Sequence, residues 1–172
     1  MNAISQSVSD ESIVIALGSN LAGGHASCEA LLEAALAALA AHGLTLTSRS
    51  GWWRSAAWPD PTAPAYLNGV ALVETALTPR ETLEALHAIE RQFGRERGEI
   101  NAARTLDLDL IAFGRRLIDE PGLRLPHPRA HERLFVMGPL AEIVPAWRHP
   151  VNKESAAVLA AAARVGQDAR PA

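Results

Sequence analysis

The stretch "TLDLDL", residues 105–110, alternates aspartate with leucine and leads into an apolar run that ends at Phe113. Side chains two residues apart in a β-strand lie on the same face, so Asp107 and Asp109 share one face and the leucines occupy the other. This pattern predicts a half-buried strand. Two neighbouring carboxylates repel each other, and burying them without a partner is costly. We therefore expect positive charge beside them.

The composition of the chain limits its class. It has 172 residues, of which 48% are hydrophobic, enough for one domain with a sizeable core. The net charge of −3 argues against a general nucleic-acid binder or a basic membrane-surface protein. A single cysteine, Cys28, suits a reducing compartment, and neither a secretion signal nor an apolar run of membrane-spanning length is found. We expect a cytoplasmic protein.

Apolar periodicity and turn residues outline the order of elements. Residues 1–11 and 165–172 are predicted to be flexible tails, and 12–164 a single domain. Strands are expected at 12–17, 44–55, 66–75, 106–113 and 116–118, and helices at 25–41, 78–94, 134–143 and 155–164. The first six elements follow the order β-α-β-β-α-β. This order predicts an α+β fold of the ferredoxin-like type, an antiparallel sheet with helices packed on it and C-terminal additions.

The two aspartates offer hard oxygen ligands of the kind that Mg²⁺ prefers. The alternatives are a solvated strand face or an ion pair with Arg104. Arg95, Arg97 and Arg104 lie on a polar loop just before the strand, where they could close over a polyphosphate–magnesium complex. A charged surface loop is the alternative for this segment.

His127 stands between two prolines in "LPHPRAHER", residues 125–133, so a stiff segment would present its ring. It could donate to a phosphate, with Arg129 and Arg133 close in sequence; the alternative is a surface histidine. The other histidines without supporting context are interpreted as surface residues: His25, His42, His131 and His149. The sequence has neither zinc-ligand spacing nor a P-loop.

Aromatic residues suggest a pocket for a flat heterocycle. Trp58 in a proline-rich loop, Tyr66 and Phe135 could stack on such a ring, and Asn68 could satisfy its polar edge. Core packing is the alternative for Tyr66 and Phe135, and we assign Trp52 and Trp53 to packing.

These motifs together resemble the 6-hydroxymethyl-7,8-dihydropterin pyrophosphokinase family of folate biosynthesis over about residues 12–150. "ARTLDLDLIAFG" is similar to the family's "RTLDLD" signature. It is accompanied, in the family's order, by "IALGSN", "YLNGVALVET", "IERQFGRER" and "LPHPRAHERLFVMGPL".

The resemblance implies Mg²⁺-dependent transfer of pyrophosphate from ATP to the pterin's hydroxymethyl oxygen, releasing AMP. It implies that Asp107 and Asp109 bind two Mg²⁺ ions and that Arg95 and Arg104 lie on a closing catalytic loop. Nucleotide contacts are implied for His87, Glu90, Arg97, His127 and Arg133, and pterin contacts for Ser55, Ala56, Trp58, Tyr66, Asn68 and Phe135. We expect a monomer that binds ATP and 6-hydroxymethyl-7,8-dihydropterin, with no nucleic-acid or membrane partner.

The chain departs from the family pattern at two places. Asn101-Ala102-Ala103 stands where the family often has "W-G-P" or "N-G-P", and Pro128 follows the histidine in place of an aromatic or polar residue. These departures bear on loop closure and one nucleotide contact. They leave open a catalytically inactive homologue that keeps the nucleotide or pterin pocket. A ferredoxin-like RNA-binding module is a further alternative, but it would need exposed aromatic and basic residues on its strands.

Overall fold

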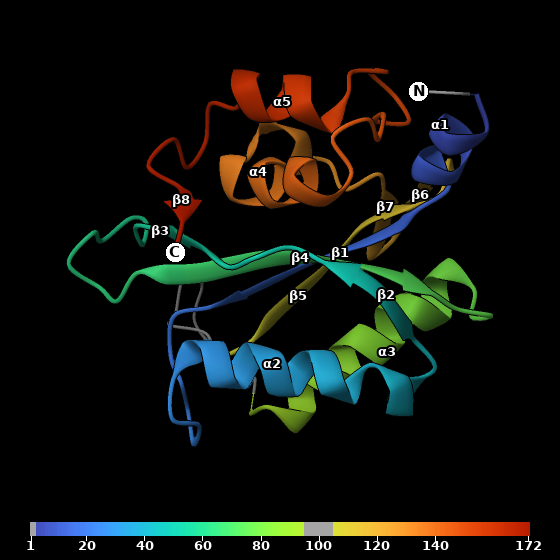
Figure 1. Cartoon of the computed structure of the whole chain (residues 1–172). Helices are drawn as coiled ribbons and strands as arrows, with labels where there is room; N and C mark the ends of the chain where they lie inside the picture. Colours follow the sequence, from blue (N-terminus) through green and yellow to red (C-terminus); the bar gives the residue numbers. More distant parts are fainter. Residues whose placement is uncertain (1–2, 95–104) are drawn as a thin grey trace.

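The computed structural model describes residues 3–94 and 105–172, without the side chains of 3–5 and 7. It has three layers, in which one sheet lies between helices α2 and α3 on one side and α4 and α5 on the other (Figure 1). The fold is thus a mixed one of helices and an antiparallel sheet.

The six strands of the main sheet follow the order β5-β1-β4-β3-β8, and β2 also pairs with β4. Every one of these pairings is antiparallel. β5, the strand predicted from "TLDLDL", lies at the end of this order beside β1. The strands are β1 (Ile13–Ser19), β2 (Thr45–Arg49), β3 (Trp53–Ser55), β4 (Tyr66–Glu74), β5 (Asp107–Phe113) and β8 (Arg170–Pro171).

One face of the sheet is covered by α2 (Cys28–Ala38) and α3 (Pro79–Gln92). Alternate residues of the strands face these helices, and the core between them is rich in leucine. The helix predicted at 78–94 is confirmed, and a capping box closes its start: the Thr78 hydroxyl accepts from Glu81 N at 3.2 Å, and the Glu81 carboxylate accepts from Thr78 N at 2.8 Å. Pro79 occupies the first turn, where its missing N–H costs nothing.

The other face packs against α4 (Leu134–Ile143) and α5 (Ala156–Ala162). Val14 and Ala16 of β1 and Val70 and Leu72 of β4 contribute to this second core, together with the fully buried Trp147. Short elements complete the chain: the 3-10 turns η1 (Ala40–His42) and η2 (Ala130–Glu132), and a separate hairpin of β6 (Ile118–Glu120) and β7 (Leu123–Leu125).

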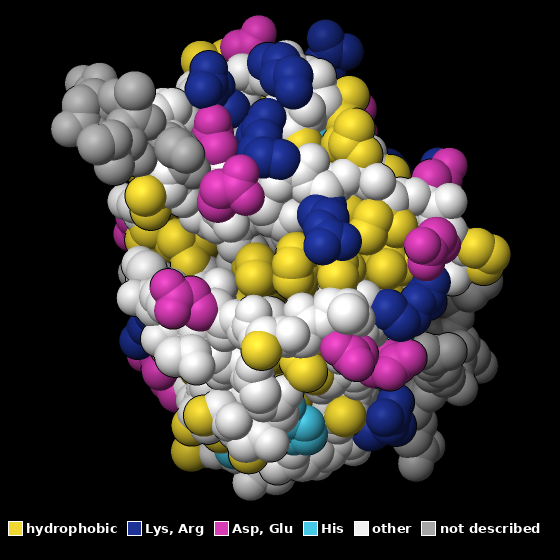
Figure 2. Space-filling model, turned by 90° about the vertical axis from the view of Figure 1, so that its right-hand side faces the viewer, with side chains coloured by type: hydrophobic (Ala, Val, Ile, Leu, Met, Phe, Trp, Pro, Cys, Tyr) yellow, Lys and Arg dark blue, Asp and Glu magenta, His cyan; other side chains and the backbone are white. Residues whose placement is uncertain are grey.

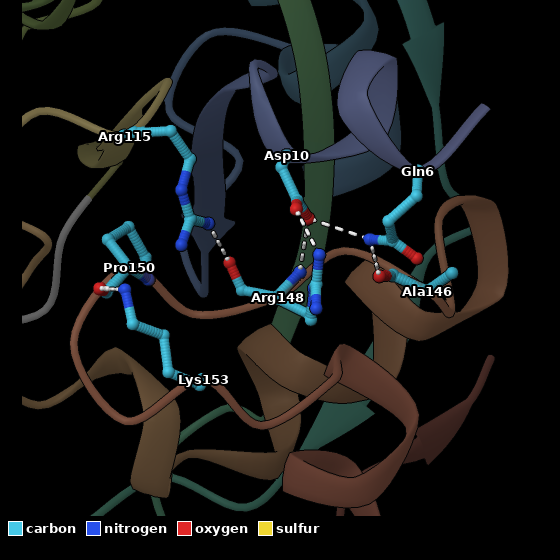
Figure 3. Close-up of polar contacts among 7 residues, drawn as sticks. All are labelled: Gln6, Asp10, Arg115, Ala146, Arg148, Pro150 and Lys153. Atoms are coloured by element: carbon cyan, nitrogen blue, oxygen red, sulfur yellow. Dashed lines mark hydrogen bonds and ion pairs between the residues drawn. The ribbon is translucent and has the colours of Figure 1, made fainter. Parts of the chain in front are cut away.

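The N-terminal segment differs from the predicted flexible tail, because helix α1 spans Ala3–Asp10. Its anchors lie far away in the sequence. The Asp10 carboxylate accepts from Arg148 through both the backbone N and the guanidinium, each at 3.1 Å, and the Gln6 amide donates to Ala146 O at 2.7 Å (Figure 3). The pKa of Asp10 is lowered because the hydrogen bonds and charge from Arg148 and Gln6 outweigh the opposing effect of burial, the largest single influence.

The C-terminal segment also differs from the prediction. Residues 170–171 form β8, which pairs with β3, and Ala169 is buried. The predicted strand 44–55 is two strands, β2 and β3, and β2 has a register shift between Leu46 and Ser48. Between the two strands, Ser50 N donates to Val70 O at 2.9 Å and the Ser50 hydroxyl accepts from Val70 N at 3.0 Å. His149, interpreted as a surface residue, is instead buried and packs edge-on against Trp147.

Candidate functional site

The two aspartates of β5 lie on the face of the sheet that carries α4 and α5, and both are half-buried. Asp107 stands opposite Gly18 of β1 and Asp109 opposite Ala16. The leucines beside them point to the opposite core, where Leu108 is almost fully buried. The alternation predicted from the sequence is therefore confirmed, and it leaves a carboxylate pair at the end of the strand next to the undescribed residues 95–104.

A single row of residues crosses four strands from this pair. Gly18 faces Asp107 on one side and Asn68 on the other, and Asn68 in turn faces Trp53. Neighbouring strands lie about 4.8 Å apart, so Asp107 and Asn68 are separated by roughly 10 Å with only a glycine between them. Because glycine has no side chain, no side chain of residue 18 rises from the sheet between the Asp107 carboxylate and the Asn68 amide. A flat ligand could lie along this row.

The end of the row at Asn68 holds the residues predicted to bind a heterocycle. Asn68 is buried, and its Nδ2 donates to the Ser55 hydroxyl at 2.9 Å. This bond fixes the orientation of the Asn68 amide. Tyr66 lies on the same strand face and is half-buried. Trp58, in the loop after β3, is 80% exposed, so its ring is available to a ligand rather than used in the core.

Phe135 and Arg133 stand above this face at the start of α4. The Arg133 guanidinium lies over the Phe135 ring, 5.8 Å from its centroid, which is cation–π range. The other edge of the ring is covered by Gly166, where an added Cβ would come within 2.5 Å of Phe135 Cδ1. The Phe135 ring is thus held from two sides and only half-buried.

His127 lies beside Asp107 and Arg133. Its backbone N donates to Ile111 O of β5 at 2.8 Å, which ties the segment to the edge of the sheet. Burial chiefly, and the positive charge of Arg133 next, lower the pKa of His127 to about 4, while the Asp107 carboxylate opposes this shift. The ring is therefore neutral near pH 7. Since His127 Nδ1 accepts from Arg129 N at 3.2 Å, the proton of the neutral ring is on Nε2, which can donate to an anion.

His87 and Glu90 occupy a different layer. Both lie on α3, which packs on the leucine-bearing face of β5, and Glu90 is buried. An ATP molecule held by these two side chains and by Asp107 would have to pass around the β5 edge of the sheet. The structure therefore brings together Asp107, His127, Arg133 and Phe135, but sets His87 and Glu90 apart from them. Arg95, Arg97 and Arg104 lie outside the described residues.

The described part of the chain supplies two carboxylates for a cation rather than a complete cage. Within residues 3–94 and 105–172, no group of three or more His, Cys, Asp or Glu side chains is placed to hold a metal ion. Mg²⁺ typically binds one or two carboxylates and fills its remaining positions with water and substrate phosphates. The pair at 107 and 109 fits that requirement, whereas a zinc site would need more protein ligands.

Sequence reasoning missed two contributors to the site. Trp53 was assigned to packing, and it does pack on Gly138 of α4, but it also ends the row that starts at Asp107. Asp168 carried no signal, because it lies in a short polar segment; its carboxylate accepts from Ala56 N at 2.6 Å.

None of the described helices is long and apolar enough to cross a membrane.

Comparisons with known proteins show which family the chain is similar to. The family model described as 7,8-dihydro-6-hydroxymethylpterin-pyrophosphokinase (HPPK) matches residues 14–145. The chain is 45% identical over 120 residues to a 2-amino-4-hydroxy-6-hydroxymethyldihydropteridine pyrophosphokinase of Synechocystis sp., covering 69% of this chain and 61% of that relative. A protein of the same name from Bacillus subtilis is 39% identical over 130 residues, with 75% of each chain covered.

The match in length is partial for the first relatives. A protein of the same name from Pseudomonas aeruginosa is 43% identical, and 59% of this chain and 65% of that relative are covered. The chain thus spans less than two thirds of this relative and of the Synechocystis protein. Among solved structures, wild-type HPPK-DHPS of Plasmodium falciparum superimposes with a TM-score of 0.63 at 12% identity, over 87% of this chain and 43% of that one, which shows a shared fold.

Proposed function

The chain belongs to the 7,8-dihydro-6-hydroxymethylpterin-pyrophosphokinase family, and from this premise we propose that it transfers pyrophosphate from ATP to 6-hydroxymethyl-7,8-dihydropterin. The observation that carries the proposal is the row Asp107–Gly18–Asn68, which aligns a carboxylate pair with a buried amide across an open glycine. One end suits a magnesium–phosphate group and the other the polar edge of a pterin. The reaction requires both ends on one surface.

In the proposed reaction, the hydroxymethyl oxygen bonds to the β-phosphorus of ATP. The bond from this phosphorus to the oxygen that bridges to the α-phosphorus breaks, and AMP leaves with the electron pair. The hydroxyl proton passes to solvent. Such transfers depend mainly on positioning and on stabilisation of phosphate charge, so no strong protein base is needed.

Asp107 and Asp109 would hold two Mg²⁺ ions, which when bound supply positive charge to the phosphate oxygens. His127 Nε2 and the Arg133 guanidinium would donate to the phosphates from the α4 side. Arg97, His87 and Glu90 would complete the nucleotide contacts, and Arg95 and Arg104 would approach from the preceding loop. These assignments rest on the motif positions, supported for His127 by the influence of both Asp107 and Arg133 on its ring.

At the Asn68 end of the row, the Asn68 amide would form hydrogen bonds with the polar edge of the pterin. Tyr66 and Phe135 would pack on the ring, and the backbone at Ser55, Ala56 and Trp58 would line the loop side. The Asn68–Ser55 hydrogen bond supports this role, because an amide with a fixed orientation distinguishes donors from acceptors.

The proposal extends to the setting of the enzyme. The sheet order, with β2 and β3 beside β4, supports a ferredoxin-like core in a single domain that also includes the chain ends predicted to be tails. We place the enzyme in the cytoplasm as a monomer, in line with its single cysteine. Acidic and basic side chains are interspersed on the face seen in Figure 2, which supports the absence of a nucleic-acid partner.

The test is a coupled assay for AMP with the purified full chain, ATP, Mg²⁺ and 6-hydroxymethyl-7,8-dihydropterin. The proposal predicts AMP only when the pterin is present. Binding of both substrates without AMP formation would instead identify the inactive homologue that the altered Asn101-Ala102-Ala103 sequence leaves open.

A further inference from the structure

The last residues of the chain, 165–172, run from the start of α4 to strand β3 (Figure 1). We refer to them as the C-terminal clamp. They follow the region 14–145 that the family model matches. At one end, Val165 N donates to Glu132 O at 3.0 Å and Leu134 N donates to Val165 O at 2.9 Å, which joins the clamp to the segment that carries Phe135.

The clamp contacts the Phe135 ring directly. Gly166 has a φ of +68° and lies so close to the ring that an added Cβ would come within 2.5 Å of Cδ1 and 3.0 Å of Cε1. The Gly166 backbone therefore restricts movement of the Phe135 ring toward it. The Arg133 guanidinium lies over the same ring, 5.8 Å from its centroid.

The clamp also holds the opposite wall of the site. Asp168 accepts from Ala56 N at 2.6 Å, directly where the loop after β3 begins. β8 pairs Arg170 with Arg54, and Ala172 N donates to Trp52 O at 2.9 Å. The loop itself is exposed and rich in proline, so these bonds fix the point from which it leaves the sheet.

We propose that the C-terminal clamp sets the width of the pterin pocket by fixing Phe135 and the loop at Ala56 relative to each other, with Asp168 as a positioning residue. This inference rests on the proposed function, because it takes these two walls as the pterin-binding ones. Binding to walls already in place avoids the entropy cost of ordering them. Loss of the Asp168–Ala56 hydrogen bond should therefore weaken pterin binding and leave nucleotide binding unchanged, because this bond lies at the loop after β3 and not at the segment that carries Arg133.

The test is calorimetry on the full chain with Mg²⁺ and an ATP analogue that has a methylene group between the α- and β-phosphorus, followed by 6-hydroxymethyl-7,8-dihydropterin. Removing one hydrogen bond in Asp168→Ala should raise the Kd for the pterin about threefold to tenfold and leave the Kd for the analogue within about twofold. Asp168→Asn keeps an oxygen that can accept from Ala56 N, so it should restore pterin binding to within about twofold of wild type. Glu84→Ala, which removes an exposed carboxylate on α3, is the matched control and should change neither affinity.

Gly166→Ala is the second variant. It combines a strained φ with a methyl group pressed against Phe135, so it should weaken pterin binding by more than Asp168→Ala does. Thermal unfolding of each variant shows whether the chain remains folded at the assay temperature.

Unchanged pterin binding in Asp168→Ala would overturn the clamp, and so would an equal loss of pterin and nucleotide binding, which marks a purely structural role. A wild type that binds pterin but forms no AMP would overturn the proposed function alone, and the same binding data would still decide on the clamp. A wild type that binds no pterin would overturn both.

Discussion

The two faces of the sheet differ along the same strand. On the face toward α2 and α3, Leu106, Leu108 and Leu110 are each at most 4% exposed. On the face toward α4 and α5, Asp107 and Asp109 are half-buried, and apolar residues take over only at Ile111 and Ala112. The face toward α2 and α3 is thus buried along the whole strand. The face toward α4 and α5 is buried at Ile111 and Ala112 and polar at Asp107 and Asp109.

The difference between the faces shows how one strand can contribute both to the core and to a polar site. A β-bulge between Val14 and Ile15 of β1 shifts the register against β5, and beyond it both Ile111 and Ala112 contribute to the second core. Before the bulge, the part of the row from Asp107 through Gly18 to Asn68 carries no large apolar side chain. The leucine face therefore contributes stability, and the aspartate face can hold charge without a buried and unpaired carboxylate.

The largest expected effect is on the polar face. Asp107→Ala should lower AMP formation by at least about a thousandfold, because charge stabilisation at the phosphates is lost, while the fold is retained. Steady-state assays and circular dichroism measure the two properties. Asp119→Ala removes an exposed carboxylate from β6 that pairs with Arg124 at 3.1 Å, and it should leave activity within about twofold. Retained activity in Asp107→Ala would remove the metal assignment.

The neighbouring residue on the sealed face should behave in the opposite way. Leu108→Ala should reduce the free energy of unfolding by about 2–5 kcal/mol, because it leaves a cavity in a fully packed core. Urea unfolding measures this loss. Leu117→Ala, at a side chain that is 65% exposed, should cost little. If Leu108→Ala removed activity without a loss of stability, the assignment of stability to the leucine face and of activity to the aspartate face would be wrong.

A smaller effect is expected from His127, which stands beside the polar face. His127→Ala should weaken binding of the Mg²⁺–ATP analogue about tenfold, since a hydrogen bond to a charged phosphate is lost. In the wild type, NMR titration of the His127 ring should show a midpoint near pH 4, in line with a pKa lowered mainly by burial. A midpoint near 6.5 would contradict the lowered pKa and the burial that causes it.

The smallest effect concerns the pH dependence of stability. Burial, together with the charges of His131, Arg115 and Lys153, lowers the pKa of His149 to about 4, while an unfolded histidine titrates near 6.5. Between these values the unfolded state binds more protons, so stability should fall as the pH falls from 6.5 to 4. His149→Gln should flatten this dependence in urea unfolding at several pH values. If the free energy of unfolding of His149→Gln depended on pH as strongly as that of the wild type, His149 would not be one of the groups that cause the dependence.

Local patterns in the sequence predict the polar face well and the chain ends poorly. The alternation at 105–110 and the start of the helix at Thr78 depend on residues within a few positions, so both could be predicted from the sequence. Helix α1 depends on contacts with Arg148 and Ala146, about 140 residues away, and β8 on pairing with β3. The burial of His149 likewise involves a contact with His131, which the residues around His149 in the sequence do not indicate.

The most direct test of the account is calorimetric binding of the α,β-methylene ATP analogue with Mg²⁺ or with a chelator, in the wild type and in Asp107→Asn/Asp109→Asn. We expect the wild type to bind the analogue at least about tenfold more tightly with Mg²⁺, and the double variant to lose this difference. An equal gain from Mg²⁺ in both proteins would show that the aspartates of β5 do not hold the metal and would contradict the central claim.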